Sequence, residues 1–238
     1  TYQDPNLELI DEWAEAWSYS LIKSSANLAV EKGSCTGSLE TKYGQGITPN
    51  QTYKEDVDEL VKHKERQDWK GLRKQLAETG IRNSTLMALM PAETSAQISN
   101  STNGIEPPRS YVSIKQSKHG VLKQVVPGYP YYKNKYDLLW DQKSPQGYLK
   151  IMAVLQKYID QGISVNTSYN PEHYEDEKVP MSVLIQDILM FYKYGGKQLY
   201  YNNTYDGQGE IDIHKEDKQQ EELALSEIDD EDCESCKI

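Results

Sequence analysis

The sequence has few cysteines, no long apolar run and no excess of basic residues, and each of these absences excludes a class of protein. No stretch approaches the ~20 consecutive apolar residues that a membrane-spanning helix needs, and no signal-peptide pattern opens the chain. Three cysteines in 238 residues are too few for a disulfide scaffold and are typical of a reducing, cytoplasmic compartment. The formal net charge of −11 leaves no basic footprint for nucleic acid. We therefore expect a cytoplasmic protein with neither a membrane nor a nucleic-acid partner.

Most of the negative charge lies near the carboxyl end. From Asp206 onward the chain carries 13 acidic residues against 3 lysines, so this segment holds −10 of the total charge of −11. Such a segment is too polar to bury the surface that folding requires. It ends in a C-x-x-C motif, Cys233 and Cys236, which lacks the second ligand pair of a zinc site, so we expect no metal. The pattern predicts a nearly neutral body, 1–205, and an acidic tail, 206–238.

The apolar spacing of the body predicts helices that alternate with short strands. Helical periodicity covers 10–28, 69–76, 148–159 and 181–194, and β-like runs cover 163–166 and 197–201. In the first helix Trp13 and Trp17 belong to the apolar stripe that would pack inward, and Gly33 is placed to end the helix. Asp68 can cap the second helix and Gly80 can close it, and the tyrosine-rich region 129–136 is predicted to be irregular. A hairpin is predicted for 111–126, and the glycine-containing segment 37–50 is predicted to be a surface connection. Strands that alternate with helices of this length indicate parallel β/α units, so the fold class is α/β.

The residues between 83 and 109 combine three signals. The run 84–90 is apolar enough for one buried strand, and Pro91 would end it. Thr94 and Gln97 have the spacing of a capping box, which would start a helix. Free N–H groups at a helix start bind anions. The stretch therefore suggests a phosphate-binding loop, although an ordinary strand-to-helix connection fits equally well. The loop consists of Pro91, Ala92, Glu93, Thr94 and Ser95.

The run MPAETSAQISNSTNGIEPPR resembles the substrate-diphosphate loop of the large (alpha) chain of class I ribonucleotide reductase. Residues 82–85, Tyr200 with Tyr201, and the closing CESCKI also resemble that family. The resemblance implies the carboxyl-terminal part of a ten-stranded α/β barrel, followed by a flexible acidic tail. About three β/α units are too few to close a barrel. We expect a fragment, or one piece of a split subunit, that needs the missing amino-terminal portion.

The resemblance also implies roles for particular residues. The five-residue loop would bind the diphosphate of ribonucleoside diphosphates, with Ala92 where many members have serine. Tyr200 and Tyr201 would carry an oxidising equivalent from the diiron-tyrosyl radical of a separate small (beta) subunit, and no cofactor would be bound by this chain itself. Cys233 and Cys236 would shuttle electrons from thioredoxin or glutaredoxin. The helix at 181–194 would help to dock the small subunit. Thiyl-radical reduction to deoxyribonucleotides is the implied activity.

Adjacent residues on a regular strand face opposite sides, so Tyr200 and Tyr201 can stack only if the backbone there departs from β geometry. We expect such an irregularity. Two other functions stay open on the sequence alone. The chain could be a non-catalytic, phosphate-binding or regulatory remnant of the subunit, or a thiol-exchange protein that uses Cys233 and Cys236.

Overall fold

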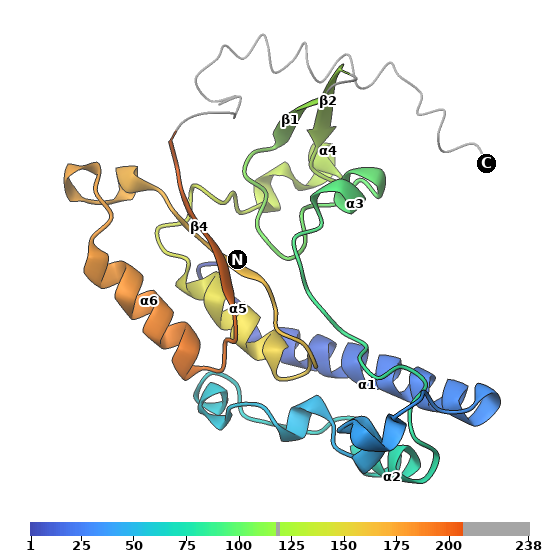
Figure 1. Ribbon diagram of the computed structural model, residues 1–238. Coiled ribbons are helices and arrows are strands. Elements are labelled where there is room, and N and C mark those ends of the chain that lie inside the picture. Colours follow the sequence, from blue (N-terminus) through green and yellow to red (C-terminus); the bar gives the residue numbers. More distant parts are fainter. Residues whose placement is uncertain (118–119, 207–238) are drawn as a thin grey trace.

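The structure is a computed structural model that describes residues 1–117 and 120–206. The predicted acidic tail, with Cys233 and Cys236, lies outside the described residues. Within them, helices and strands mix as expected of an α/β protein (Figure 1). Long helices form the lower part of the molecule in that view, and a hairpin with two short helices forms the upper part.

The first helix, α1, spans Leu7–Lys32. Asn6 caps it by accepting a hydrogen bond from the Leu9 N–H, and Gly33, with φ +80°, ends it as predicted. The predicted inward face is wrong in part, because Trp13 and Trp17 are 65% and 42% exposed. Polar residues occupy the inner face instead, since distant cations and N–H groups pair with them. The buried residues are Asp11, Ala14, Glu15, Ser18, Ile22, Ser25, Ala26 and Ala29.

The second long helix, α2, spans Trp69–Thr79. Asp68 caps it and Gly80 ends it, as the sequence predicted. The connection between α1 and α2 is not the predicted surface segment, because Tyr43, Thr48 and Asn50 are buried within it. Arg73 of α2 donates to the Thr48 hydroxyl of this connection at 3.1 Å. The connection also contains short 3-10 turns. They span Ser38–Glu40, Tyr43–Gln45, Pro49–Gln51 and Glu55–Glu59.

The carboxyl-terminal half of the body contains a parallel β/α unit. Helix α5 (Gln146–Gln156) leads to strand β3 (Val165–Tyr169), and helix α6 (Met181–Lys193) leads to strand β4 (Leu199–Thr204). β3 and β4 pair in parallel and lie side by side in Figure 1. The prediction of parallel β/α connections is confirmed, with each strand starting two residues later than expected. Two 3-10 turns, Pro171–His173 and Glu175–Glu177, separate β3 from α6.

The upper part of the molecule contains the predicted hairpin. Strands β1 (Val112–Ser117) and β2 (Gly120–Val125) pair antiparallel, with Ser117 opposite Gly120. Helix α3 (Glu93–Ile98) and helix α4 (Tyr129–Tyr132), with a 3-10 turn at Lys133–Lys135, lie beside it (Figure 1). The region 129–136, predicted to be irregular, therefore contains two short helical turns.

The predicted strand at 84–90 is wrong within the described residues. The segment is extended but belongs to neither two-stranded sheet. Its neighbour is the connection between α5 and β3, where Asp160 accepts hydrogen bonds from the N–H groups of Leu86 and Met87. The Ser164 N–H donates to the Leu89 carbonyl at 3.0 Å. A side chain and isolated backbone bonds thus replace a ladder, because a connecting loop and not a strand runs beside the segment.

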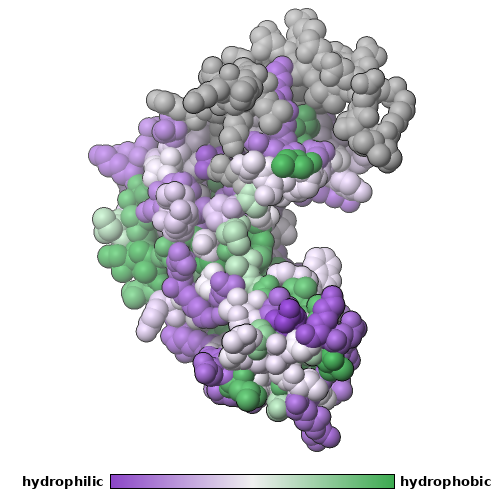
Figure 2. Space-filling model, turned by 45° about the vertical axis from the view of Figure 1, so that its right-hand side comes forward, coloured by the Kyte–Doolittle hydropathy of each residue, from purple (hydrophilic) through white to green (hydrophobic). Residues whose placement is uncertain are grey.

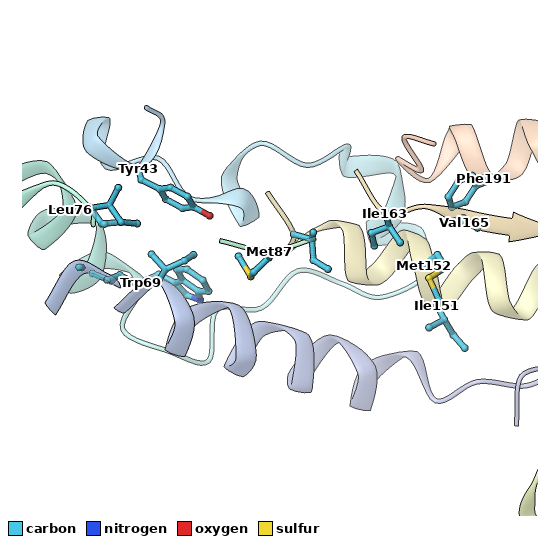
Figure 3. Packing of buried hydrophobic residues seen from close by; sticks show 14 of the residues in the cluster. Tyr43, Trp69, Leu76, Met87, Ile151, Met152, Ile163, Val165 and Phe191 are labelled. Atoms are coloured by element: carbon cyan, nitrogen blue, oxygen red, sulfur yellow. The ribbon is translucent and has the colours of Figure 1, made fainter. Parts of the chain in front are cut away.

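A continuous apolar core joins the helices to this segment and to β3. Met87 is 1% exposed and lies between residues of α2 and residues of α5 (Figure 3). Val165 of β3 and Phe191 of α6 extend the same cluster. Burial of large apolar side chains stabilises each by roughly 1.5 to 3 kcal/mol. The labelled members are Tyr43, Trp69, Leu76, Met87, Ile151, Met152, Ile163, Val165 and Phe191.

A network of buried charges fixes α1 against the rest. The Asp11 carboxylate, fully buried, accepts hydrogen bonds from Lys157 at 2.9 Å and from Arg66 at 2.8 Å. Its oxygen also accepts a 2.8 Å bond from the Tyr158 hydroxyl. Glu15, one turn further along α1, accepts bonds from Arg66 and from the Trp69 indole. The network therefore ties α1 to the end of α5 and to the start of α2.

Replacement of Asp11 by alanine should destabilise the folded chain by about 3 to 5 kcal/mol, because it leaves the buried Lys157 ammonium without its main partner. Urea unfolding followed by circular dichroism measures this change. Glu12→Ala is the matched control, since Glu12 is the next residue of α1 and is exposed. Equal stability of the two variants would show that the network does not hold the fold together.

Candidate functional site

The phosphate-loop candidate lies where the extended segment meets α3. The helix begins at Glu93, with Ala92 as its N-cap residue and no side-chain cap. The predicted capping box is therefore wrong, because Thr94 is already the second helical residue and its side chain lies too far along to cap. The N–H groups of Glu93, Thr94 and Ser95 occupy the first turn, where no intrahelical acceptor exists for them. Thr94 and Ser95 are exposed, so a ligand can reach their hydroxyls.

The segment that follows α3 folds back and holds the loop. The Asn103 side chain accepts a 2.7 Å hydrogen bond from the Ala92 N–H. The Ser101 N–H donates to the Ala96 carbonyl at 2.9 Å. A small hollow lies between the loop, the returning segment and α5, with Pro91, Gly104 and Tyr148 in its lining. The loop is thus fixed at both ends, and its first turn stays open.

The tyrosine pair lies on an irregular part of β4. Val165 of β3 is opposite Leu199, and Thr167 is opposite Asn202, so β4 advances three residues while β3 advances two. The extra residue is a β-bulge. The rings of Tyr200 and Tyr201 consequently lie on one side, with centroids 4.2 Å apart and planes at 56°. Their hydroxyl oxygens are 3.4 Å apart. The predicted departure from β geometry is confirmed.

A second tyrosine pair provides a comparison. Tyr131 and Tyr132 are also consecutive, but they lie in α4, and their ring centroids are 6.5 Å apart. Tyr131 is 84% exposed. The close contact of Tyr200 and Tyr201 is therefore a consequence of the bulge and not of adjacency alone.

Two residues that the sequence analysis did not single out connect the loop to the tyrosine pair. The Asn166 side chain accepts a 3.0 Å hydrogen bond from the Tyr201 N–H. Its amide nitrogen donates to the Glu106 carboxylate at 2.5 Å. The Glu106 N–H in turn donates to the carbonyl of Asn103, the residue that holds the loop. The signal in the sequence was a polar asparagine within an otherwise β-like run.

Glu106 lies among buried phenols. Burial, together with the carboxylates of Asp137 and Glu106, raises the pKa of Tyr2 to about 12. Burial and then Glu106 also raise the pKa of Tyr148. Both phenols therefore stay protonated at neutral pH.

An apolar face of α6 is open to solvent. The inner side of the helix is held by Asp187, which is fully buried and accepts bonds from Gln146 and Tyr169. Figure 2 shows hydrophobic residues gathered on the left, over the region where α6 lies in Figure 1. The exposed apolar residues of α6 are Met181, Ile185, Ile188, Leu189 and Tyr192, from 48% to 69% exposed.

The described part of the chain lacks two features that would point to other kinds of site. No helix there is both long and apolar enough to cross a membrane. No cluster of three or more histidine, cysteine or acidic side chains there has the arrangement of a metal site. Cys233 and Cys236 lie outside the described residues.

Comparison with protein families defines the class of this chain. A family model described as "Ribonucleotide reductase, barrel domain" matches residues 2–130 and 127–202. The chain therefore belongs to the ribonucleotide reductase barrel-domain family.

Individual relatives agree with this assignment. The chain is 56% identical over 197 residues to the ribonucleoside-diphosphate reductase subunit alpha of Haemophilus influenzae, which covers 83% of this chain and 26% of the relative. It is 50% identical to the reductase 1 subunit alpha of Escherichia coli, over 94% of this chain and 28% of the relative. It is 42% identical to the ribonucleoside-diphosphate reductase subunit alpha of Enterobacteria phage T4, over 100% of this chain and 30% of the relative. The chain thus spans less than a third of the length of each of these relatives.

Proposed function

We propose that this chain is the carboxyl-terminal portion of the catalytic subunit of a class I ribonucleoside-diphosphate reductase. In this proposal it acts in the cytoplasm with the amino-terminal portion and the small subunit, and reduces ribonucleoside diphosphates by thiyl-radical chemistry. The family assignment and the named relatives support it. The observation that carries it is the ring contact of Tyr200 and Tyr201 on a bulged strand, because ordinary sheet packing does not require it.

The described strands fit an incomplete barrel. β3 and β4 form a two-stranded parallel sheet, and the segment 84–90 runs extended without a strand partner among the described residues. Parallel sheets in globular proteins are covered on both faces, and a barrel leaves no free edge. In the proposal the amino-terminal portion supplies the strands that complete a ten-stranded α/β barrel.

The loop from Pro91 to Ser95 would bind the substrate diphosphate. Pro91 has no N–H, and the Ala92 N–H is already bonded to Asn103. The N–H groups at the start of α3 and the hydroxyls of Thr94 and Ser95 therefore provide the donors. Glu93 would contribute its backbone, because a carboxylate would repel the anion. The positive end of the helix dipole, which lies at the start of α3, would also favour binding of the diphosphate.

Ser95→Ala should weaken substrate binding by roughly 1 to 3 kcal/mol, because a hydroxyl bonded to a charged oxygen is lost. The measurement is the diphosphate dissociation constant of the reconstituted enzyme. Ser99→Ala is the matched control, since Ser99 follows the carboxyl end of the same helix, where the dipole disfavours an anion. Unchanged affinity in Ser95→Ala would count against the loop as the diphosphate site.

The tyrosine pair would relay an oxidising equivalent. In the proposal the small subunit holds the diiron-tyrosyl radical, and this chain binds no cofactor directly. Each phenol gives up an electron and its proton as the equivalent arrives, and recovers both as the equivalent moves on toward the amino-terminal portion. Ring contact at 4.2 Å makes the two phenols neighbours for such a transfer.

Tyr200→Phe and Tyr201→Phe should each abolish turnover, because phenylalanine forms no phenoxyl radical, while substrate affinity and fold stay unchanged. Tyr131→Phe, in the exposed pair on α4, should retain full turnover. The measurement is deoxyribonucleotide formation by the reconstituted enzyme. Full activity of either Tyr200 or Tyr201 variant would refute the relay.

Cys233 and Cys236 would return electrons to the active site. Their thiols are oxidised to a disulfide as a disulfide in the amino-terminal portion is reduced, and thioredoxin or glutaredoxin then reduces the pair. Replacement of both by serine should leave the first turnover and dithiothreitol-driven activity intact and remove thioredoxin-driven activity. Steady turnover of this double variant with thioredoxin would exclude the shuttle.

The open face of α6 would dock the small subunit. Five large apolar side chains exposed on one helix form the kind of surface that marks a protein interface. Photo-crosslinking from Ile188 tests this assignment. Crosslinks to the small subunit support it, and crosslinks only to the amino-terminal portion would oppose it.

A further inference from the structure

We infer that Asn166 and Glu106 are positioning residues that create the contact between Tyr200 and Tyr201. The inference rests on the proposed function, because it gives this pair of residues a part in the relay. It adds two residues that neither the sequence motifs nor the relatives' names assign. The evidence is a hydrogen-bonded chain that runs from Glu106 through Asn166 to the bulge in β4.

The bulge creates a backbone requirement that Asn166 meets. In a regular parallel ladder each inward N–H finds a carbonyl on the neighbouring strand. An extra residue in β4 leaves one N–H without such a partner, and a backbone group without a hydrogen-bond partner destabilises the strand. Here the N–H of Tyr201 donates to the Asn166 side chain at 3.0 Å. Asn166 lies between Val165 and Thr167, where the register shifts. A side-chain carbonyl thus replaces the missing backbone acceptor.

Glu106 fixes which end of the asparagine amide faces the bulge. A carboxylate only accepts hydrogen bonds, so the amide nitrogen of Asn166 must face Glu106. The amide oxygen must then face the Tyr201 N–H, which only donates. Asn166 is 8% exposed, so bulk water does not offer an alternative partner. Only one orientation of the Asn166 amide gives hydrogen bonds to both the Glu106 carboxylate and the Tyr201 N–H. That orientation holds the bulged backbone in place.

Glu106 also connects the bulge to the phosphate-loop segment. The Glu106 N–H donates to Asn103, and Asn103 holds the Ala92 N–H. Pro107 and Pro108 follow Glu106 and restrict the backbone there. The carboxylate is therefore presented by a segment that is itself anchored, and it positions Tyr201 through the Asn166 side chain.

The test uses the complete enzyme, formed from this chain, the amino-terminal portion and the small subunit. Asn166→Asp keeps the size of the side chain, but places a second carboxylate against Glu106, and repulsion between the two carboxylates turns the introduced group away from the Tyr201 N–H. We expect turnover to fall at least about 10-fold, with unchanged affinity for the diphosphate. Hydrogen exchange of the Tyr201 N–H should accelerate by about 10-fold, which corresponds to the loss of one hydrogen bond of ordinary strength.

A reciprocal swap separates positioning from general damage. In the double variant Glu106→Gln/Asn166→Asp, the introduced glutamine amide donates to the introduced carboxylate, which still accepts from Tyr201. Turnover and amide protection should both recover to within about threefold of the original enzyme. Asn203→Ala is the matched control, because Asn203 also bridges β4 to β3, through Ser168, and should leave both readouts unchanged.

The outcomes distinguish this inference from the proposed function. Full turnover and normal Tyr201 exchange in Asn166→Asp would overturn the inference while leaving the relay intact. Loss of turnover in Asn166→Asp that the double variant Glu106→Gln/Asn166→Asp does not restore would also overturn the inference. If Tyr201→Phe keeps full activity, the relay fails, yet accelerated exchange in Asn166→Asp and its rescue would still establish that these residues hold the bulge.

Discussion

The buried carboxylate of Asp11 is the interaction on which the rest of the structure depends. It lies on α1, yet its partners come from the end of α5 and from the segment before α2. Removal of a charge from water is costly unless it is paired, so the burial of Asp11 requires all three elements to be in place. Helix α5 then carries the chain to β3, and β3 carries the asparagine that accommodates the bulge in β4. The position of the tyrosine pair thus depends on a charge network far from it in sequence.

Local signals in the sequence predicted the elements that begin and end by local chemistry. Helix α2 begins after Asp68 and ends before Gly80, and the hairpin and α6 form where the apolar spacing of their residues predicts them. The inner face of α1 could not be predicted in this way, because Asp11 and Glu15 are buried by partners from 51 to 147 residues away. The apolar spacing predicts that the large tryptophans lie on that face, but Trp13 is exposed in the structure. Periodicity ranks side chains by hydropathy and does not detect distant counterions.

The candidate site shows the same division. The loop residues and the tyrosine pair were identified by resemblance, and the bulge followed from the two-residue period of a strand. The predicted strand at 84–90 does not form, because a strand needs a neighbouring strand to pair with. The segment beside 84–90 is a loop, and its Asp160 accepts a hydrogen bond from the Leu86 N–H. Glu106 and Asn166 were missed because their bond joins residues 60 apart. Contacts of that range have no local sequence signature.

The most direct test of the central claim is reconstitution. This chain, the amino-terminal portion and the small subunit are mixed with a thiol reductant, and deoxyribonucleotide formation from a ribonucleoside diphosphate is measured. The account predicts turnover in the complete mixture and none when the amino-terminal portion is omitted. Turnover by this chain with the small subunit alone would contradict it. So would diphosphate binding without turnover in the complete mixture, which would make the chain a non-catalytic remnant.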